Sequence, residues 1–166
     1  MIKKLIMVLA VAVALPIAMN AQKFGVVNVE EVMTSLPDFK TMQNQLEEAS
    51  KRYDEEYKKL QEEFDKKYAE FQGLAKDTPE SILERRMAEL KELDQKMQQF
   101  RNTATQDLQR QQQTLMAPIE QKLMEAIKAV GQEGSYTFIF QDGMAVYQGN
   151  DVQNVTPQVK TKLGIK

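Results

Sequence analysis

The sequence contains neither cysteine nor histidine among its 166 residues, so any chemistry must rest on other side chains. This composition excludes thiol nucleophiles, disulfides, the usual zinc sites and imidazole acid–base catalysis. Carboxylates are abundant, but neighbours such as Glu62 and Glu63 point in different directions around a helix. No serine lies in a Gly-x-Ser-x-Gly motif, and Asp142-Gly143 is typical of a turn rather than a metal loop. We therefore expect no enzymatic activity, no metal and no cofactor.

The side chains that stand out instead are aromatic residues and methionines spaced along two predicted helices. Methionine and tyrosine suit surfaces that contact variable apolar partners, whereas a purely structural seam between helices favours leucine and isoleucine. Each residue could belong to the seam or to a binding surface, and both roles can coexist because two helices cannot bury so wide a stripe on all sides. The candidate binding residues are Tyr53, Tyr57, Phe64, Tyr68, Phe71, Met87, Met97 and Phe100.

The first of these helices is predicted from Pro37 to about Lys76, because proline suits the first helical position. From Met42 to Ala75 the apolar residues follow a 4, 3, 4 spacing with a period of eleven residues. This period gives about 3.67 residues per turn and predicts a straight rod. A heptad repeat would bury charged residues and is disfavoured. The other face carries acid–base pairs four residues apart, such as Glu47/Lys51 and Glu63/Lys67, which are typical of a solvated helix surface.

The second helix is predicted to begin at Thr78-Pro79, with Thr78 as its N-cap, and to end at Gly131 and Gly134. A turn centred on Asp77 would place Asp38 opposite Met116 in an antiparallel pair. Pro118 follows two residues later, and a proline inside a helix kinks it. We therefore expect the arm to end, and the body to begin, near Pro118.

The remaining segments predict a small body that contains strands. Phe24–Val29 is typical of a buried strand, and Glu30–Leu36 of one or two helical turns. Tyr136–Phe140 and Met144–Gln148 flank the Asp142-Gly143 turn and predict a β-hairpin. Thr156-Pro157 predicts a short helix that ends at Gly164.

Three short strands make a very small core, so we expect the body to be completed by association between subunits. The candidate association residues are Val27, Val29, Phe138, Phe140 and Val146.

The N-terminal residues are typical of a secretory signal peptide. Lys3 and Lys4 precede an apolar run from Leu5 to Met19, which is shorter than the roughly 20 residues that span a bilayer. We expect cleavage before Gln22 and export of the mature chain. Without the two lysines, 20 basic residues face 24 acidic ones, so no overall positive field attracts nucleic acid.

The sequence thus predicts a mainly α fold with a small β body, from which a long antiparallel two-helix hairpin projects as an arm. Residues 1–21 form the signal peptide, residues 22–36 and 117–166 the oligomerisation body, and residues 37–116 the arm.

The C-terminal segment also carries a resemblance to a known family. An early strand at Lys23–Val29 and long arm helices are followed by Phe138-Ile139-Phe140, Met144-Ala145-Val146-Tyr147, Asp151-Val152 and Val155-Thr156-Pro157-Gln158-Val159. This pattern resembles the Skp/OmpH family of periplasmic chaperones over nearly the whole mature chain. The resemblance implies a homotrimer whose strands assemble a β-body and whose helical arms enclose a cavity for unfolded outer-membrane proteins, without ATP.

Two functions remain open from the sequence. The first is an ATP-independent periplasmic holdase for unfolded outer-membrane protein precursors, and the alternative is a structural or adaptor coiled-coil protein of the cell envelope that binds one defined partner. Members of the family are often basic, whereas this chain is mildly acidic. Lys76, Arg85 and Arg86 form a positive cluster near the arm tip, for which lipopolysaccharide or acidic-client contact and a solvated helix end are both open interpretations.

Overall fold

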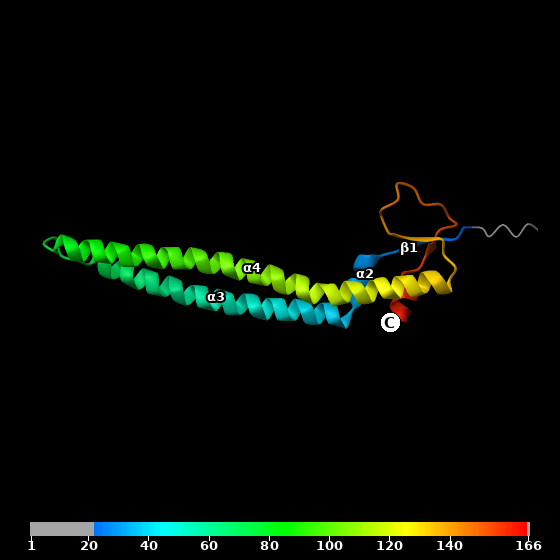
Figure 1. The fold of residues 1–166 in the computed structure, drawn as a ribbon, viewed down its shortest axis with the longest axis horizontal. Coiled ribbons are helices and arrows are strands. Elements are labelled where there is room, and N and C mark those ends of the chain that lie inside the picture. Colours follow the sequence, from blue (N-terminus) through cyan, green and yellow to red (C-terminus); the bar gives the residue numbers. More distant parts are fainter. Residues whose placement is uncertain (1–21, 166) are drawn as a thin grey trace, which may run out of the picture.

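The computed structural model describes residues 22–165, which form a long two-helix arm joined to a small body (Figure 1). The predicted signal peptide lies outside the described residues. The elements follow the order β1 (Phe24–Val27), α2 (Val29–Ser35), α3 (Pro37–Gln72), α4 (Glu80–Glu133), β2 (Phe138–Gln141), β3 (Gln153–Asn154) and α5 (Thr156–Lys162). This order confirms the mainly α fold with a hairpin arm and a small β body.

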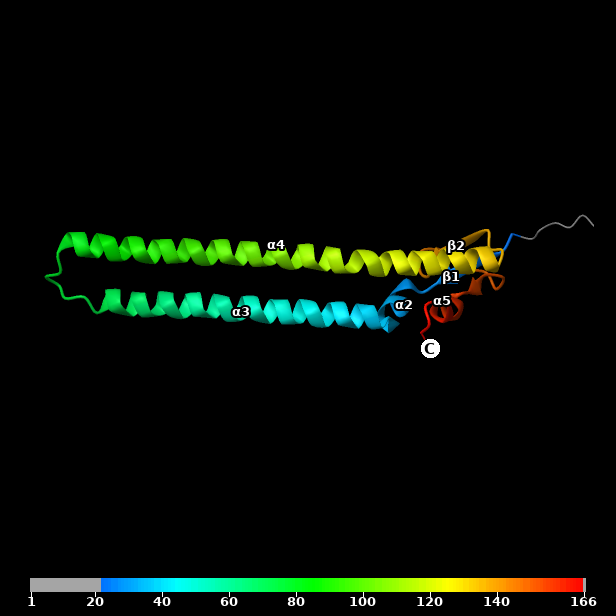
Figure 2. The ribbon, with the colours of Figure 1, turned by 60° about the horizontal axis from the view of Figure 1, so that its bottom comes forward.

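The arm consists of α3 and α4, which run side by side in both views (Figures 1 and 2). With 36 and 54 residues, they are about 54 and 81 Å long at 1.5 Å per residue. Their apolar stripes face each other and form the seam, the apolar contact between the two helices. Its buried residues are Met42, Ala49 and Leu60 on α3 and Leu93, Ala104 and Ile119 on α4.

The arm tip differs from the sequence prediction in both helix boundaries. Helix α3 ends at Gln72 rather than near Lys76, because Gly73 caps it and its N–H bonds back to the Ala69 carbonyl. Helix α4 begins at Glu80 without a side-chain cap. The predicted N-cap at Thr78 is wrong, since its hydroxyl donates to the Ala75 carbonyl at 2.7 Å instead.

The pairing of the two helices also differs from the predicted register. Asp38 meets Lys122 at 2.9 Å, six residues beyond the predicted Met116. The difference arises at the tip, where α4 extends past the end of α3 (Figure 2). The prediction had assumed a symmetric turn centred on Asp77.

Pro118 lies inside α4, beside Ile119, which packs against the start of α3 at the base of the arm. Pro118 provides no N–H for the helical ladder, which favours a bend at this position. Leu36, Met42 and Ile119 form a buried apolar cluster beside it. This cluster joins the start of α3 to α4.

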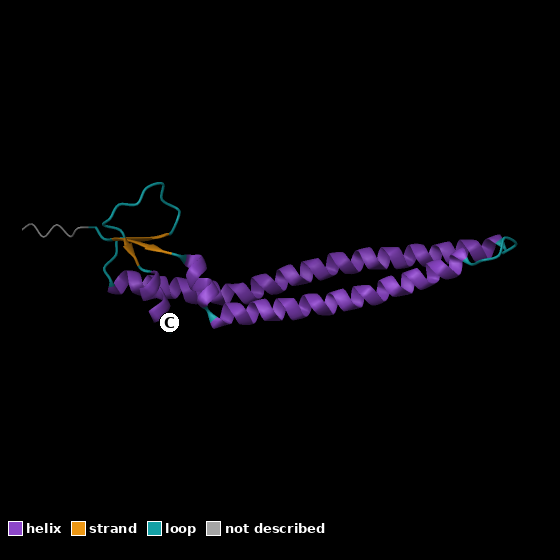
Figure 3. Cartoon of the chain, turned by 180° about the vertical axis from the view of Figure 1, so that it is seen from behind, coloured by secondary structure: helices purple, strands orange, loops and turns teal. Residues whose placement is uncertain are grey.

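The sheet is parallel, and the predicted β-hairpin is wrong. Strand β1 is central, with β2 and β3 paired parallel to it on either side. Residues 144–148 form no strand in the described chain, and Val146 is fully exposed. The turn residues Asp142-Gly143 are present, but the chain continues over the sheet as a loop before β3 (Figure 3).

The first strand is shorter than predicted, because Asn28 ends it. The Asn28 side chain accepts a hydrogen bond from the Glu31 N–H at 2.9 Å and caps α2. Val29 therefore belongs to a helix. The predicted helical turns after the strand are confirmed as α2, which buries Val32 and, at its C-cap, Leu36.

The body core lies between the sheet and the C-terminal half of α4. It contains Val27, Val32, Leu123, Ala126, Val130, Val155 and Val159. Helix α5 begins at Thr156, where the Thr156-Pro157 signal predicts it, and Val155 is its N-cap. Thr156 is buried, and its hydroxyl accepts the Asn28 N–H at 2.9 Å, which links the C-terminal helix to the end of β1.

Helices α4 and α5 end in the same left-handed turn, one with serine and one with glycine. Ser135 has φ 54° and Gly164 has φ 72°. In each turn the next residue donates to a helix carbonyl, Tyr136 to Gly131 at 2.9 Å and Ile165 to Lys160 at 3.0 Å. Serine is strained in this conformation, whereas glycine is not.

We predict that Ser135→Gly stabilises the protein by about 0.5–1 kcal/mol, because it removes strain at an exposed side chain. The reciprocal Gly164→Ser should destabilise it by a similar amount, since nothing lies within 4 Å of a Cβ added there. Urea unfolding at one fixed protein concentration measures both. Equal midpoints for the two variants would contradict the prediction.

Candidate functional site

The eight candidate binding residues divide into two groups by exposure. Tyr68 and Met87 are exposed, with 46% and 59% of their surface accessible. The other six are half-buried in the arm, namely Tyr53, Tyr57, Phe64, Phe71, Met97 and Phe100. Two of the eight residues are therefore accessible from solvent, and the arm itself partly covers the other six.

Tyr53 and Phe100 contribute directly to the seam. Their ring centroids are 6.1 Å apart in an edge-on arrangement. The Tyr53 hydroxyl donates to the Asp107 carboxylate across the seam. Next to them, the Arg101 guanidinium lies 5.8 Å from the Tyr57 ring. These aromatic rings hold the two helices together.

The exposed apolar side chains of the arm lie near its tip. Tyr68 stacks on Phe64 with a centroid distance of 6.1 Å and an angle of 7°. Ile82, which the sequence analysis did not select, is 37% exposed at the start of α4. We call Tyr68, Ile82 and Met87 the distal apolar set. The seam cannot cover these residues, because they lie off the line where the helices meet.

Charged residues join the two helices beside the distal apolar set. Glu89 on α4 accepts from Arg86 at 2.9 Å and from Lys67 on α3 at 3.4 Å. The Arg86 hydrogen bond lowers the pKa of Glu89, Lys67 adds to the lowering, and partial burial opposes it. Arg85 also lies 3.8 Å from this carboxylate. Two members of the predicted positive cluster thus already face an acid, while Lys76 is exposed.

The salt bridges predicted on the outer face of α3 form only in part. Glu47 and Lys51 pair at 2.7 Å, which lowers the pKa of Glu47 through the hydrogen bond from Lys51. Lys67 instead reaches across to Glu89, and Lys59 pairs with Glu56 at 3.2 Å. These contacts leave the outer face solvated.

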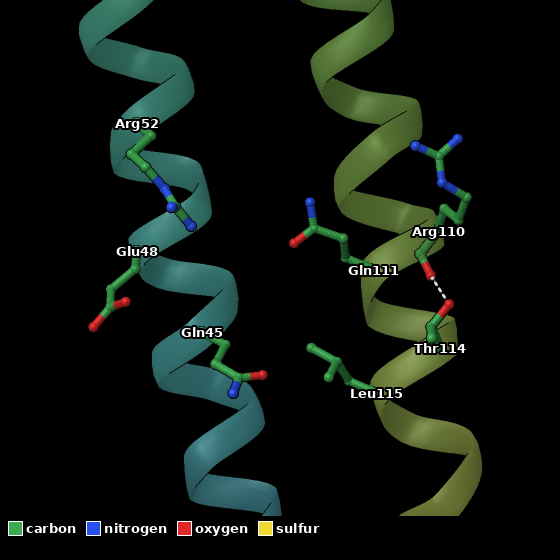
Figure 4. Close-up of a pocket in the computed structure, with 7 residues that line it drawn as sticks. All are labelled: Gln45, Glu48, Arg52, Arg110, Gln111, Thr114 and Leu115. Atoms are coloured by element: carbon green, nitrogen blue, oxygen red, sulfur yellow. Dashed lines mark hydrogen bonds between the residues drawn. The ribbon is translucent and has the colours of Figure 1, made fainter.

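A groove of about 360 Å³ lies between α3 and α4 in the basal half of the arm (Figure 4). Amide, hydroxyl and charged side chains line it, and Leu115 is its apolar member. In the described part of the chain, no group of three acidic side chains is placed to hold a metal ion. Nor does any helix from residue 22 onward have the length and apolar character to cross a membrane.

A second exposed apolar surface lies on the body. Phe24, Phe138 and Phe140 stack on the side of the sheet opposite α4, with centroid distances of 5.8 to 6.5 Å. Phe138 is 57% exposed and Phe140 44%. The loop that follows adds Met144, Val146 and Tyr147, which are exposed by 72%, 108% and 85%. We call these six residues the association face.

Three of the five candidate association residues lie on this face, namely Phe138, Phe140 and Val146. Val27 instead lies in the core of the subunit, and Val29 packs against that core. Phe24 was missed, although its alternation with buried Gly25 and its register opposite Phe138 place it on the same face. The sequence carried no such signal, because residues 24–27 are apolar throughout and the register opposite Phe138 comes from the fold.

These features define a class of protein. A small body with an exposed aromatic face carries one long helical hairpin, and the exposed apolar side chains of the hairpin lie near its tip. Both surfaces are apolar and exposed in the single chain.

The comparisons with known proteins agree with this class. A family model described as outer membrane protein (OmpH-like) matches residues 23–163. The chain therefore belongs to the OmpH-like family, which confirms the resemblance seen in the sequence. A crystal structure from Caulobacter crescentus CB15, described as an OmpH-like outer membrane chaperone, matches with a TM-score of 0.74 and 13% identity. The match covers 86% of this chain and 83% of the other. The comparison with curated proteins finds no significant match.

We predict that Glu89→Gln lowers the thermal midpoint near pH 7 and has no effect near pH 2. Glu89 has a pKa below its ordinary value of 4.5 in the folded protein. Its charge therefore stabilises the fold above that value, and the contribution is lost as the pH falls through the lowered folded pKa. Thermal unfolding from pH 7 to pH 2 measures the difference.

Glu92→Gln is the matched control, because it removes the same charge one turn away at an exposed position. A difference between Glu89→Gln and wild type that stays constant with pH would contradict the assignment.

Proposed function

We propose that this protein is an ATP-independent periplasmic holdase, which binds unfolded outer-membrane protein precursors between its arms. Membership of the OmpH-like family and the fold shared with an OmpH-like outer membrane chaperone support the proposal. The observation that carries the proposal is the exposure of the distal apolar set. Its members Tyr68 and Met87 are about half exposed on a hairpin whose outer surface is mainly charged.

The chemistry of these side chains suits clients of variable sequence. A methionine is flexible and polarizable, and a tyrosine offers an apolar ring with a polar end. Each buried apolar side chain contributes about 1.5–3 kcal/mol at most. Several such contacts hold an unfolded chain weakly and reversibly, without a nucleotide.

Export fits this function. The predicted signal peptide at residues 1–21 directs the chain to the periplasm, where unfolded outer-membrane proteins pass. The absence of cysteine from the sequence means that folding requires no oxidation there.

We further propose that the association face assembles subunits into a homotrimer whose arms enclose a cavity. A single body exposes three stacked phenylalanines, which is unfavourable in water. Strands β2 and β3 are the sheet edges of the described chain, and each can accept a further strand. Residues 144–148, which have the pattern of a strand but lie unpaired in the single chain, can supply one.

An adaptor that binds one defined partner remains the second candidate. The observation that favours it is the half-burial of six of the eight aromatic and methionine residues, which makes the stripe mainly a structural seam. A narrow binding surface at the tip would then suit one partner better than many clients.

For the holdase, we predict that Tyr68→Ser/Met87→Gln raises the concentration needed for half suppression of client aggregation by about tenfold. The expected loss is about 1.4 kcal/mol of apolar contact, which corresponds to a factor of ten. Light scattering of an unfolded outer-membrane β-barrel protein, diluted from urea without nucleotide, measures the effect.

Met124→Gln is the control for this assay, because Met124 is 52% exposed on the same helix but lies in the body. Wild-type protein that fails to suppress aggregation, combined with capture of one tight partner, would favour the adaptor. Equal losses for the control and the distal variant would exclude the distal apolar set as the binding surface.

For association, we predict that Val146→Asp converts the oligomer into folded monomers. Val146 is fully exposed in the single chain, so the substitution leaves the subunit intact while placing a charge on the association face. Sedimentation velocity with circular dichroism measures both properties. Ile82→Asp, at the arm tip, is the control and should sediment like wild type, and a wild-type monomer would contradict the trimer.

A further inference from the structure

The apolar seam of the arm is interrupted at Asp107 on α4. Its side chain is only 20% exposed. It accepts the Tyr53 hydroxyl from α3 and the Gln111 side-chain amide at 2.8 Å, and it pairs with the Arg110 guanidinium. Tyr53 thus provides the bond that crosses from one helix to the other. We call Tyr53 and Asp107 the clasp.

The seam on either side of the clasp is apolar and repetitive. Towards the tip it contains Leu60 and Leu93, and towards the base Met42 and Ile119. Because apolar residues recur every three or four positions, a slide of one helix by one turn, about 5.4 Å, places apolar side chains over apolar side chains again. Hydrophobic packing alone therefore selects the register weakly. The clasp favours one register, because any other register loses the Tyr53 hydrogen bond, although Asp107 keeps Gln111 and Arg110 on its own helix.

The clasp lies beside a groove between the two helices and one turn from the buried seam residues Ala49 and Ala104. In the groove of Figure 4, Gln45 on α3 and Gln111 and Leu115 on α4 point into the space between the helices. The base of the arm is held separately by the Asp38–Lys122 pair and by the Leu36 cluster. Nearer the tip, Lys67 on α3 pairs with Glu89 on α4 at 3.4 Å. The clasp is the polar connection in the middle of the arm, between this pair and the base.

We propose that Tyr53 and Asp107 are positioning residues, which fix the register and rotation of α3 against α4 in the distal part of the arm. They act through the seam and do not themselves contact a client. The register determines which side chains face outward near the tip, Tyr68 and Met87 among them. Any effect of Tyr53 and Asp107 on client binding rests on the proposed function. Their effect on the register of the two helices does not.

Spin-label distances in the full mature chain test the register directly. The sequence contains no cysteine, so Asp65→Cys and Gln95→Cys provide two unique, exposed labelling sites beyond the clasp. Labelled chain is diluted with excess unlabelled chain, so that each oligomer carries at most one pair. Wild type should give one narrow distance, and Tyr53→Phe should give a broadened or two-peaked distribution.

The double variant Tyr53→Phe/Asp107→Leu separates positioning from simple stabilisation. It replaces a polar pair by an apolar one, so its thermal midpoint should equal or exceed that of wild type, while its distance distribution stays broad. Tyr53→Phe alone removes the hydrogen bond between the helices while Asp107 keeps Gln111 and Arg110, and it should lower the midpoint by about 3 °C.

Tyr57→Phe is the matched control, because it removes a tyrosine hydroxyl one turn away that makes no side-chain hydrogen bond. It should keep the narrow distance. Narrow distances in both clasp variants would overturn the proposal, and so would broadening in Tyr57→Phe. Broad distances in the clasp variants together with unchanged suppression of aggregation would support the role of the clasp in register. The same result would count against the arm tip as the client-binding site.

Discussion

The apolar seam between α3 and α4 is the contact on which the rest of the molecule depends. Each helix is far longer than the body, and most of its surface is charged and solvated. A single helix of this kind would expose a continuous apolar stripe, and its helical state would gain little from tertiary packing. Joining the stripes removes much of this apolar surface from water. The arm can therefore project from the body without a globular domain around it.

The seam also explains where apolar surface remains. Two cylinders meet along a line, so side chains at the edge of the stripe stay partly exposed even when those at its centre are buried. Leu60 and Leu93 lie at the centre, whereas Tyr68 and Met87 lie at the edge. Along one apolar stripe, the central residues stabilise the hairpin and the residues at its edge are accessible to another chain. Seam and binding surface form a continuum along one stripe.

The body follows a similar logic on a smaller scale. One side of its sheet packs on α4 and α5 and forms the subunit core, and the other side carries stacked phenylalanines that the subunit does not cover. Two exposed apolar surfaces therefore lie at opposite ends of the molecule. The long charged helices between them keep these surfaces apart, so under the proposed function the body could associate while the arm tip stays accessible.

The sequence by itself determined the two long helices and their ends in the body, because the apolar spacing repeats over many residues and Pro37 and Gly134 are local signals. It did not determine where the helices end at the tip. Nor did it determine the sheet. Strand β1 pairs with β2 and β3 across more than a hundred residues, so the local Asp142-Gly143 signal predicted a hairpin where long-range pairing prevailed. The exposure of each aromatic residue and the contact of Tyr53 with Asp107 were likewise decided by the tertiary structure, because both depend on how the two helices align. A periodic stripe specifies that two helices meet, whereas only their alignment specifies which side chains remain outside.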